Sequence, residues 1–216
     1  MTKERNKLAR TMSLDRKRVK PQQAAARVAQ KPDGRRLRTE DSRQRIVAAM
    51  LALVREGSVS PNAEDVAARA GAGLRTVFRL FDNMDGLYRE MNAAMEREVM
   101  PLVLKPLEPG PWRKQLEELL GRRAEVYEQI MPVKIASDAQ QHTSVYLRNT
   151  AKRLVVMQRG GLLAVLPPDI VKDQARFEAI NLVMSFEAWR RLRKEQGLSI
   201  KRAREAVTLA VKGLIG

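Results

Sequence analysis

Residues 70–88 read AGAGLRTVFRLFDNMDGLY, and this stretch decides the fold. Two glycines, Gly71 and Gly73, precede a segment barely two helical turns long that carries Arg75 and Arg79. Gly71 is able to adopt the left-handed conformation that ends one helix and turns the chain without a Cβ clash. The stretch therefore predicts a short basic helix that follows a tight turn.

A second helix is predicted directly before this turn. Asn62 and Asp65 form a capping-box-like pair that starts a helix over 62–70. That helix, the turn and a helix over 74–80 have the spacing of a helix-turn-helix, whose second helix reaches base edges in a DNA major groove. Arginine suits a bidentate contact with guanine. The outward face of the second helix is expected to carry Leu74, Arg75, Thr76 and Arg79.

The rest of the sequence has helical periodicity and no sustained two-residue alternation, which predicts an all-α fold of about nine helices. Thr39 is the expected N-cap of the first helix, with Glu40 and Asp41 complementing the helix dipole. Glycines and prolines mark most of the helix ends. The further expected helices are 39–56, 83–100, 112–129 (bounded by Pro132), 137–157, 169–196 and 199–214.

Composition limits the class of protein. The chain has 216 residues, of which 44% are hydrophobic and 4% aromatic, enough apolar material for a helical core. It contains no cysteine, which excludes disulfides and thiolate metal sites. No apolar block follows the charged N-terminus, and the apolar run 46–54 is about half a membrane span. We therefore expect a cytoplasmic protein without a membrane partner.

Positive charge is concentrated at the N-terminus. The net charge is +16, and residues 1–43 hold fourteen Lys and Arg against five Asp and Glu. Residues 1–38 lack a sustained apolar face, so we expect a basic flexible arm. Such an arm is either a solvated tail or a binder of phosphates that releases their counterions. Arg35, Arg36 and Arg38 are expected either to enter a minor groove or to attract phosphates diffusely.

The long helix expected over 169–196 carries two apolar stripes. One contains Ala175, Ala179, Leu182, Phe186 and Trp189, and the other contains Phe177, Ile180, Met184 and Ala188. One stripe covers the core of its own domain, and the second favours the same helix of a second subunit. A helix buried all round within one chain is the alternative. The expected dimer interface consists of Ala179, Leu182, Phe186, Ala206 and Ala210.

The stretch RIVAAMLALVREGSVSPNAEDVAARAGAGLRTVFRLFDNMDGLYREM (45–91) resembles the DNA-binding domain of TetR/AcrR-type bacterial transcriptional regulators. The matching positions are Val66-Ala67, the turn over 70–73, Thr76-Val77-Phe78 and Phe81. SFEAWRRLRKEQGLS (185–199) and the final helix also look like the last two helices of that family, which build its dimer. The resemblance covers about residues 39–216, closely at 45–91 and loosely between 100 and 165.

This resemblance implies three regions: the arm 1–38, a helix-turn-helix DNA-binding domain over 39–84, and a helical effector-binding and dimerisation domain over 85–216. It implies DNA binding as a homodimer on a palindromic operator. The expected DNA-binding residues are Arg35, Arg36, Arg38, Arg43, Asn62, Gly73, Leu74, Arg75, Thr76, Phe78, Arg79 and Asn83. Asn62 is expected to cap its helix, to place that helix N-terminus against a phosphate, or to do both.

The sequence departs from the family pattern at four positions. Phe78 stands where a phosphate-donating Tyr is usual, Leu80 where His is common, and Met84 where a Lys opens the next helix. Gly73 replaces a Ser or Thr N-cap. These departures remove polar phosphate contacts, so the two helix arginines and the basic arm are the expected sources of affinity.

The family encloses an apolar effector pocket among its middle helices, and the resemblance implies one here. The candidate pocket residues are Trp112, Tyr127, Met131, Tyr146, Met157, Phe177 and Trp189. For each of them, a place in the plain apolar core is the alternative. The implied effector is a small apolar molecule.

The sequence offers no chemistry for an enzyme, a metal or a cofactor. His142 is the single histidine and has no second ligand at metal spacing. There is no Walker glycine loop, no GxSxG and no HExxH. We therefore expect no catalytic site, no metal site and no cofactor.

The overall interpretation is a sequence-specific DNA-binding transcriptional regulator, a ligand-responsive homodimeric repressor of the bacterial cytoplasm that associates with the nucleoid. Two alternatives remain at this point. One is an architectural or nonspecific DNA-binding protein without an effector. The other is a small-molecule-binding protein whose DNA-binding domain is weakened.

Overall fold

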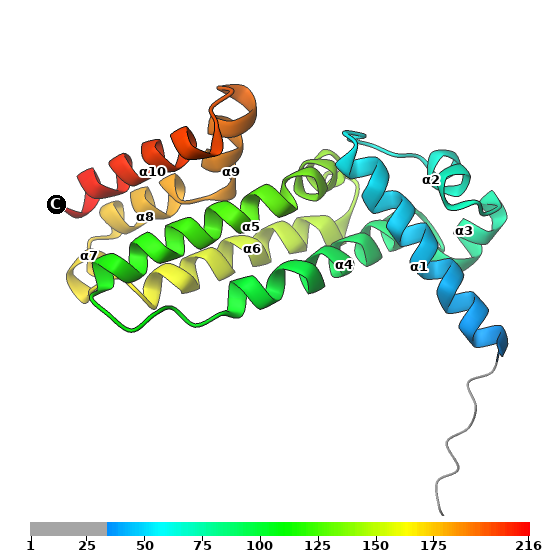
Figure 1. Ribbon diagram of the computed structural model, residues 1–216, viewed down its shortest axis with the longest axis horizontal. Coiled ribbons are helices and arrows are strands. Elements are labelled where there is room, and N and C mark those ends of the chain that lie inside the picture. Colours follow the sequence, from blue (N-terminus) through cyan, green and yellow to red (C-terminus); the bar gives the residue numbers. More distant parts are fainter. Residues whose placement is uncertain (1–33) are drawn as a thin grey trace, which may run out of the picture. The chain divides into compact units, whose positions relative to one another are not determined.

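The computed structural model describes residues 34–216, so the predicted arm up to residue 33 lies outside the described residues. This part of the chain forms ten α-helices, one π-helical segment and no strand, which confirms the all-α prediction (Figure 1). The helices are α1 (Gly34–Arg55), α2 (Ala63–Ala70), α3 (Leu74–Phe81), α4 (Met84–Leu104), α5 (Trp112–Gln140), α6 (Val145–Leu163), α7 (Pro168–Lys172), α8 (Gln174–Val183), α9 (Phe186–Arg190), the π-helical segment η1 (Arg191–Glu195) and α10 (Ile200–Ile215).

The first helix begins five residues earlier than expected. Residues 34–38, assigned to the arm from sequence, form the first turn of α1. Thr39 is therefore not the N-cap, and its Oγ1 instead donates to the Arg35 carbonyl oxygen at 2.9 Å within the helix. A threonine hydroxyl can cap a helix N-terminus, but it can also donate to the carbonyl oxygen four residues earlier inside a helix. The sequence does not separate these two roles, and the start of the first helix was therefore predicted too late.

The predicted boundary between the fifth and sixth helices is also wrong. α5 continues through Pro132 to Gln140, because the residues on both sides, Met131 and Val133, are buried in the core. The burial of this apolar stripe offsets the hydrogen bond that proline removes. α6 then begins at Val145, where the Ser144 Oγ accepts from the Leu147 N–H at 3.0 Å.

The single helix predicted over 169–196 is broken at two points, into α7, α8 and a last piece in which α9 continues directly into η1. Asp173 ends α7 and caps α8, where its carboxylate accepts from the Arg176 N–H at 3.1 Å. Ser185 caps α9 in the same way, accepting from the Ala188 N–H at 3.2 Å. Short polar side chains that bond the nearby backbone compete with helix continuation at both joints.

The helices α4, α5 and α6 run side by side, coloured green to yellow in Figure 1. α8 and α10 pack on each other and α10 also packs on α5, whereas α3 packs between α2 and α4. The core is apolar, with Met50 of α1, Leu87 of α4 and Phe186 of α9 completely buried. The Phe186 ring meets the Tyr127 ring edge to face at a centroid distance of 5.7 Å. α4 is thereby shared between the short helices and the long bundle.

None of the helices between residues 34 and 216 combines the length and hydropathy that crossing a membrane requires.

Candidate DNA-contacting surface and ligand cavity

The turn between α2 and α3 has the geometry predicted from sequence. The Asp65 N–H donates to Asn62 Oδ1 at 2.8 Å and the Asn62 N–H donates to Asp65 Oδ2 at 3.4 Å, which completes the capping box. Gly71 follows α2 in the left-handed conformation, at φ 60° and ψ 37°. Because a Cβ is strained at that φ, Gly71 turns the chain where another residue would resist. Gly73 precedes α3 with no side-chain cap.

One face of α3 is packed and the other is open. Val77, Leu80 and Phe81 are buried against the core. The open face consists of Leu74 and Phe78, which are 37% and 44% exposed, and the exposed arginines Arg75 and Arg79, with Thr76 half-buried at its edge. Within residues 34–216, neither of these arginines has a hydrogen bond or an ion pair through its side chain. Leu80 thus belongs to the core. The presence of Leu80 where His is common in the family that the sequence resembles therefore does not change the open face.

The junction of α3 and α4 is closely packed. Asp82 has a positive φ of 60°, and Asn83 Oδ1 accepts from the Gly86 N–H at 3.0 Å to cap α4. A Cβ on Gly86 would overlap the carbonyl oxygen of Phe81, so only glycine fits there. The Asn83 side chain, predicted to bind DNA, is exposed and is used by this cap.

Arg43, predicted to contact DNA, is instead held by the protein itself. Its guanidinium donates to Glu90 Oε1 at 2.6 Å and to the Leu80 carbonyl oxygen at 2.7 Å. It also lies over the Phe81 ring, 4.9 Å from the centroid. Arg43 therefore ties α1 to α3 and α4, so its guanidinium is engaged by the protein at the position where a DNA contact was predicted.

Arg35, Arg36 and Arg38 are exposed in the first turn of α1 rather than on a flexible arm. The helix begins at Gly34, so these side chains are presented from a regular backbone.

A cavity of about 340 Å³ lies between α4, α5 and α6 and is named here the α4–α6 cavity. Its wall is mainly apolar, with a few polar groups such as Asn92, Ser137 and Thr150. The apolar lining includes Met95, Val99, Val103, Val126, Leu154 and Met157. A volume in this range and an apolar wall with few polar groups are typical of small-molecule sites.

A second cavity of about 260 Å³, named here the Arg123 cavity, continues along the same helices. It shares Val103, Val126, Leu154 and Met157 with the first. Arg123, Tyr127, Gln158 and Gly161 line its other end. The two cavities therefore share an apolar wall, with polar groups both around Arg123 and in the α4–α6 cavity, and together they are called the groove.

Two of the seven predicted pocket residues line this groove, Met157 and Tyr127. Met131, Phe177 and Trp189 are buried in the core instead, and Trp189 donates to Glu128 Oε1 at 2.7 Å. The other two are half-buried and carry arginines on their rings: Arg113 over Trp112 at 4.6 Å and Arg89 over Tyr146 at 5.3 Å. These five residues therefore lie outside the groove, because the prediction selected large side chains, four of them aromatic, without regard to how the helices pack.

The lining residues that sequence reasoning missed have a recognisable spacing. Val126, Ile130 and Val133 recur at helical spacing on α5, as do Thr150, Leu154 and Met157 on α6. Apolar residues at helical spacing are equally typical of a packed core, so this spacing does not distinguish the wall of a cavity from a packed interior.

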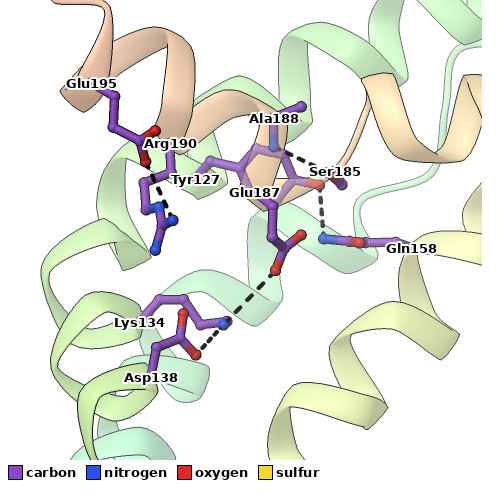
Figure 2. Close-up of polar contacts among 9 residues, drawn as sticks. All are labelled: Tyr127, Lys134, Asp138, Gln158, Ser185, Glu187, Ala188, Arg190 and Glu195. Carbon is purple, nitrogen blue, oxygen red and sulfur yellow. Dashed lines mark hydrogen bonds and ion pairs between the residues drawn. The ribbon is translucent and has the colours of Figure 1, made fainter.

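Polar groups are buried at the end of the Arg123 cavity. The Tyr127 hydroxyl donates to the Met184 carbonyl oxygen at 2.9 Å. It also accepts from Gln158 Nε2 at 2.9 Å, a contact drawn in Figure 2. Arg123 donates to the Met184 carbonyl oxygen at 3.2 Å and to that of Gln158. Burial raises the pKa of Tyr127 to about 12, so its hydroxyl stays protonated at neutral pH and acts as a donor. This network joins α5, α6 and the α8–α9 joint.

A charged cluster lies at the rim of the α4–α6 cavity. Lys134 Nζ lies 2.5 Å from Asp138 Oδ1 and 4.0 Å from Glu187 Oε1, as Figure 2 shows. Both Lys134 and Asp138 line the cavity. Their charges neutralise one another, so the rim has no uncompensated cation.

The residues predicted for a dimer interface divide into two groups. Leu182 of α8 is 66% exposed and Ala210 of α10 is exposed, while Ala179 and Ala206 are half-buried. Phe186 is completely buried against Tyr127, so it belongs to the core of its own chain and the prediction for it is wrong. Its exposure was overestimated because the helix was assumed to be continuous past residue 184.

His142 is exposed at the end of α5. Within residues 34–216, no three His, Asp or Glu side chains are placed to hold a metal ion together.

No family model and no curated protein matches this chain. A solved structure that is similar is that of the multidrug binding protein EbrR, complexed with imidazole. The superposition has a TM-score of 0.51 and 19% sequence identity, and it covers 79% of this chain and 89% of that chain. The chain therefore has the fold of TetR-type regulators.

Proposed function

We propose that this chain is a sequence-specific DNA-binding transcriptional regulator, a ligand-responsive homodimeric repressor of the bacterial cytoplasm and nucleoid, without enzymatic activity. The observation that carries this proposal is the open face of α3, where Arg75 and Arg79 are exposed on a helix whose other face is packed. In the proposed organisation, the region up to residue 84 binds DNA and residues 85–216 bind the effector and the second subunit.

The open face of α3 has the chemistry to read a major groove. Arg75 and Arg79 suit guanine, with bidentate hydrogen bonds to its O6 and N7 atoms. Phe78 and Leu74 are partly exposed and suit apolar contact with a thymine methyl group. This gives Phe78 a role in base contact where the family has a phosphate-donating Tyr. Two copies would place α3 in successive major grooves about 34–36 Å apart on a palindromic operator.

The proposed dimer uses α8 and α10. These helices pack on each other and expose Leu182 and Leu209, the latter 75% exposed. Exposed leucines on adjacent helices favour burial against a second copy, because removing their surface from water is favourable.

The effector signal would pass along α4. One side of α4 lines the α4–α6 cavity through Met95 and Val99, and its first turn packs on α3 through Gly86. The Ser144 hydroxyl at the start of α6 also donates to the Asp85 carboxylate in that first turn. A ligand with different affinities for two positions of α4 would therefore change the position of α3.

The test begins by selecting genomic fragments with the purified full-length protein and footprinting the bound ones. We expect a protected palindrome. Uniform binding without one would instead support the architectural protein.

On the selected site, Arg75→Ala and Arg79→Ala should each weaken binding by about 1–3 kcal/mol. Arg191→Ala, an exposed arginine in η1, is the matched control and should have little effect. Unchanged affinity in both α3 variants would favour a small-molecule-binding protein with a weakened DNA-binding domain.

A further inference from the structure

Arg123, in α5, is a buried cation without a carboxylate partner in the part of the chain that the structure describes. It is 9% exposed, and its guanidinium donates to the carbonyl oxygens of Met184 and Gln158. Carbonyl oxygens satisfy hydrogen bonds but carry no formal charge, so the charge of Arg123 remains uncompensated at a large desolvation cost. Burial accordingly lowers the pKa of Arg123, and Tyr127 acts in the opposite direction.

Other shielded cations near the groove are paired with carboxylates. These pairs are Arg122 with Glu118 at 2.6 Å, Lys134 with Asp138 at 2.5 Å and Arg193 with Glu128 at 2.8 Å. Arg122 is the nearest comparison, because it is adjacent in sequence and its side chain is only 9% exposed. The missing anion distinguishes Arg123 from its neighbour and favours an anion supplied from outside the chain.

Space exists beside the Arg123 guanidinium. Arg123 lines the Arg123 cavity, which continues into the α4–α6 cavity along an apolar wall. Gly161 of α6 faces the guanidinium, and a Cβ there would lie 3.5 Å from Arg123 Nη2. A ligand whose acid group lies beside Arg123 would place its apolar part in the rest of the groove.

We propose that the effector of this chain is an amphipathic carboxylate, whose acid group pairs with Arg123 while its apolar chain occupies the groove between α4, α5 and α6. The inference rests on the proposed function, because it names the ligand class of the same effector site. One guanidinium matches one carboxylate, with N–H donors left over after the two bonds to carbonyl oxygens. A phosphate dianion would leave a second negative charge buried without a partner.

The test compares three ligands with the same ten-carbon chain by isothermal titration calorimetry on the full-length protein. Decanoate carries the proposed carboxylate, decanol is neutral and decylammonium is a cation. We expect decanoate to bind about tenfold or more tightly than decanol, as charge-assisted hydrogen bonds in a desolvated site predict. Decanol or decylammonium binding as tightly as decanoate would overturn the proposal.

Variants locate the acid group. Arg123→Gln should reduce decanoate affinity to that of decanol. Because Arg123 also donates to two carbonyl oxygens, its replacement removes these contacts of the fold as well. A pair of glycine variants therefore tests the position of the acid group with Arg123 intact. Gly161→Ala places a methyl group beside the guanidinium at ordinary contact distance, and we expect a several-fold loss of decanoate affinity. Gly160→Ala, where a Cβ meets nothing within 4 Å, is the matched control and should bind decanoate normally. Equal decanoate affinities in both variants would place the acid group elsewhere.

The failure of this inference is distinguishable from that of the proposed function. Selected genomic DNA bound by a protein that prefers decylammonium would leave the regulator intact and reject the carboxylate. Decanoate bound through Arg123 by a protein that selects no DNA would support the ligand class and reject the regulator.

Discussion

Gly86, in the first turn of α4, lies directly against the main-chain carbonyl group of Phe81 at the end of α3. A Cβ at residue 86 would overlap the carbonyl oxygen and lie 3.2 Å from the carbonyl carbon. Because the obstructing atoms belong to the backbone, two helices would have to separate to admit a side chain. The missing side chain therefore determines how closely the proposed recognition helix approaches α4.

We predict that Gly86→Ala lowers the free energy of unfolding by about 1–3 kcal/mol, the usual cost of overpacking, and also weakens operator binding. Chemical denaturation and DNA titration measure the two effects. Gly160→Ala in α6 is the control, because its Cβ is unobstructed and alanine in a helix should stabilise by about 0.5–1 kcal/mol. Wild-type stability in the Gly86 variant would contradict the contact.

A second prediction separates structure from DNA contact at Arg43. Arg43→Gln removes a charged donor from Glu90 and from the Leu80 carbonyl oxygen, so the free energy of unfolding should fall by about 1–2 kcal/mol. Arg45→Gln removes an exposed pair with Asp41 and an exposed 3.4 Å hydrogen bond to Ser42 Oγ, and should cost about 0.5 kcal/mol or less. Equal stability of the two variants would restore Arg43 as a candidate DNA contact.

A third prediction concerns acid stability. Burial of Glu128 opposes its ionisation, but hydrogen bonds from Arg193 and Trp189 outweigh burial and lower its pKa below 4.5. A pKa lowered in the folded state stabilises the protein above pH 4.5, and that contribution is lost as the pH falls through the folded value.

Glu128→Gln should therefore be less stable than wild type at pH 7 and should lose less stability on acidification. Denaturant unfolding curves across the acid range measure this difference. Arg193→Gln removes the main partner of Glu128 and should also flatten the curve. A Glu128→Gln variant that keeps the wild-type pH dependence would show that another carboxylate is responsible.

A fourth prediction tests the proposed dimer. Leu209→Glu and Leu182→Glu place a charge on the exposed surface of α10 and α8, and each should raise the dimer dissociation constant by roughly 30-fold or more. Light scattering after gel filtration measures the mass of the assembly. Leu163→Glu, at a 51% exposed leucine of α6, should leave the mass unchanged. A monomeric wild-type protein would reject the interface directly.

Local signals predicted the short helices well. The Asn62–Asp65 capping box and the left-handed Gly71 depend on residues close in sequence, and both are confirmed. The role of Arg43 depends on Glu90, 47 residues away, and no local pattern contains that information. A capping signal is carried by neighbours, whereas an ion pair between helices is created by the fold.

The long helices were predicted less well for a related reason. Pro132 was expected to end a helix, but burial on both sides keeps α5 continuous. Ser185 was expected to lie inside a helix, but it caps a new one, and the Met184 carbonyl oxygen before it is satisfied by Arg123 and Tyr127 of α5. Tertiary contacts overrode local preference at both positions, in opposite directions.

The break before α9 also divides the C-terminal half mechanically. η1, directly after α9, is fastened to α5 by the Arg193–Glu128 ion pair, whereas α8 meets α9 through two residues, Met184 and Ser185. A continuous helix would transfer every tilt of one end to the other. With a break at this point, the direction of α8 is set by its own packing on α7 and α10, through its buried Phe177 and Ile180, and not by the anchor between η1 and α5, so the exposed leucine side of α8 is oriented independently of Phe186.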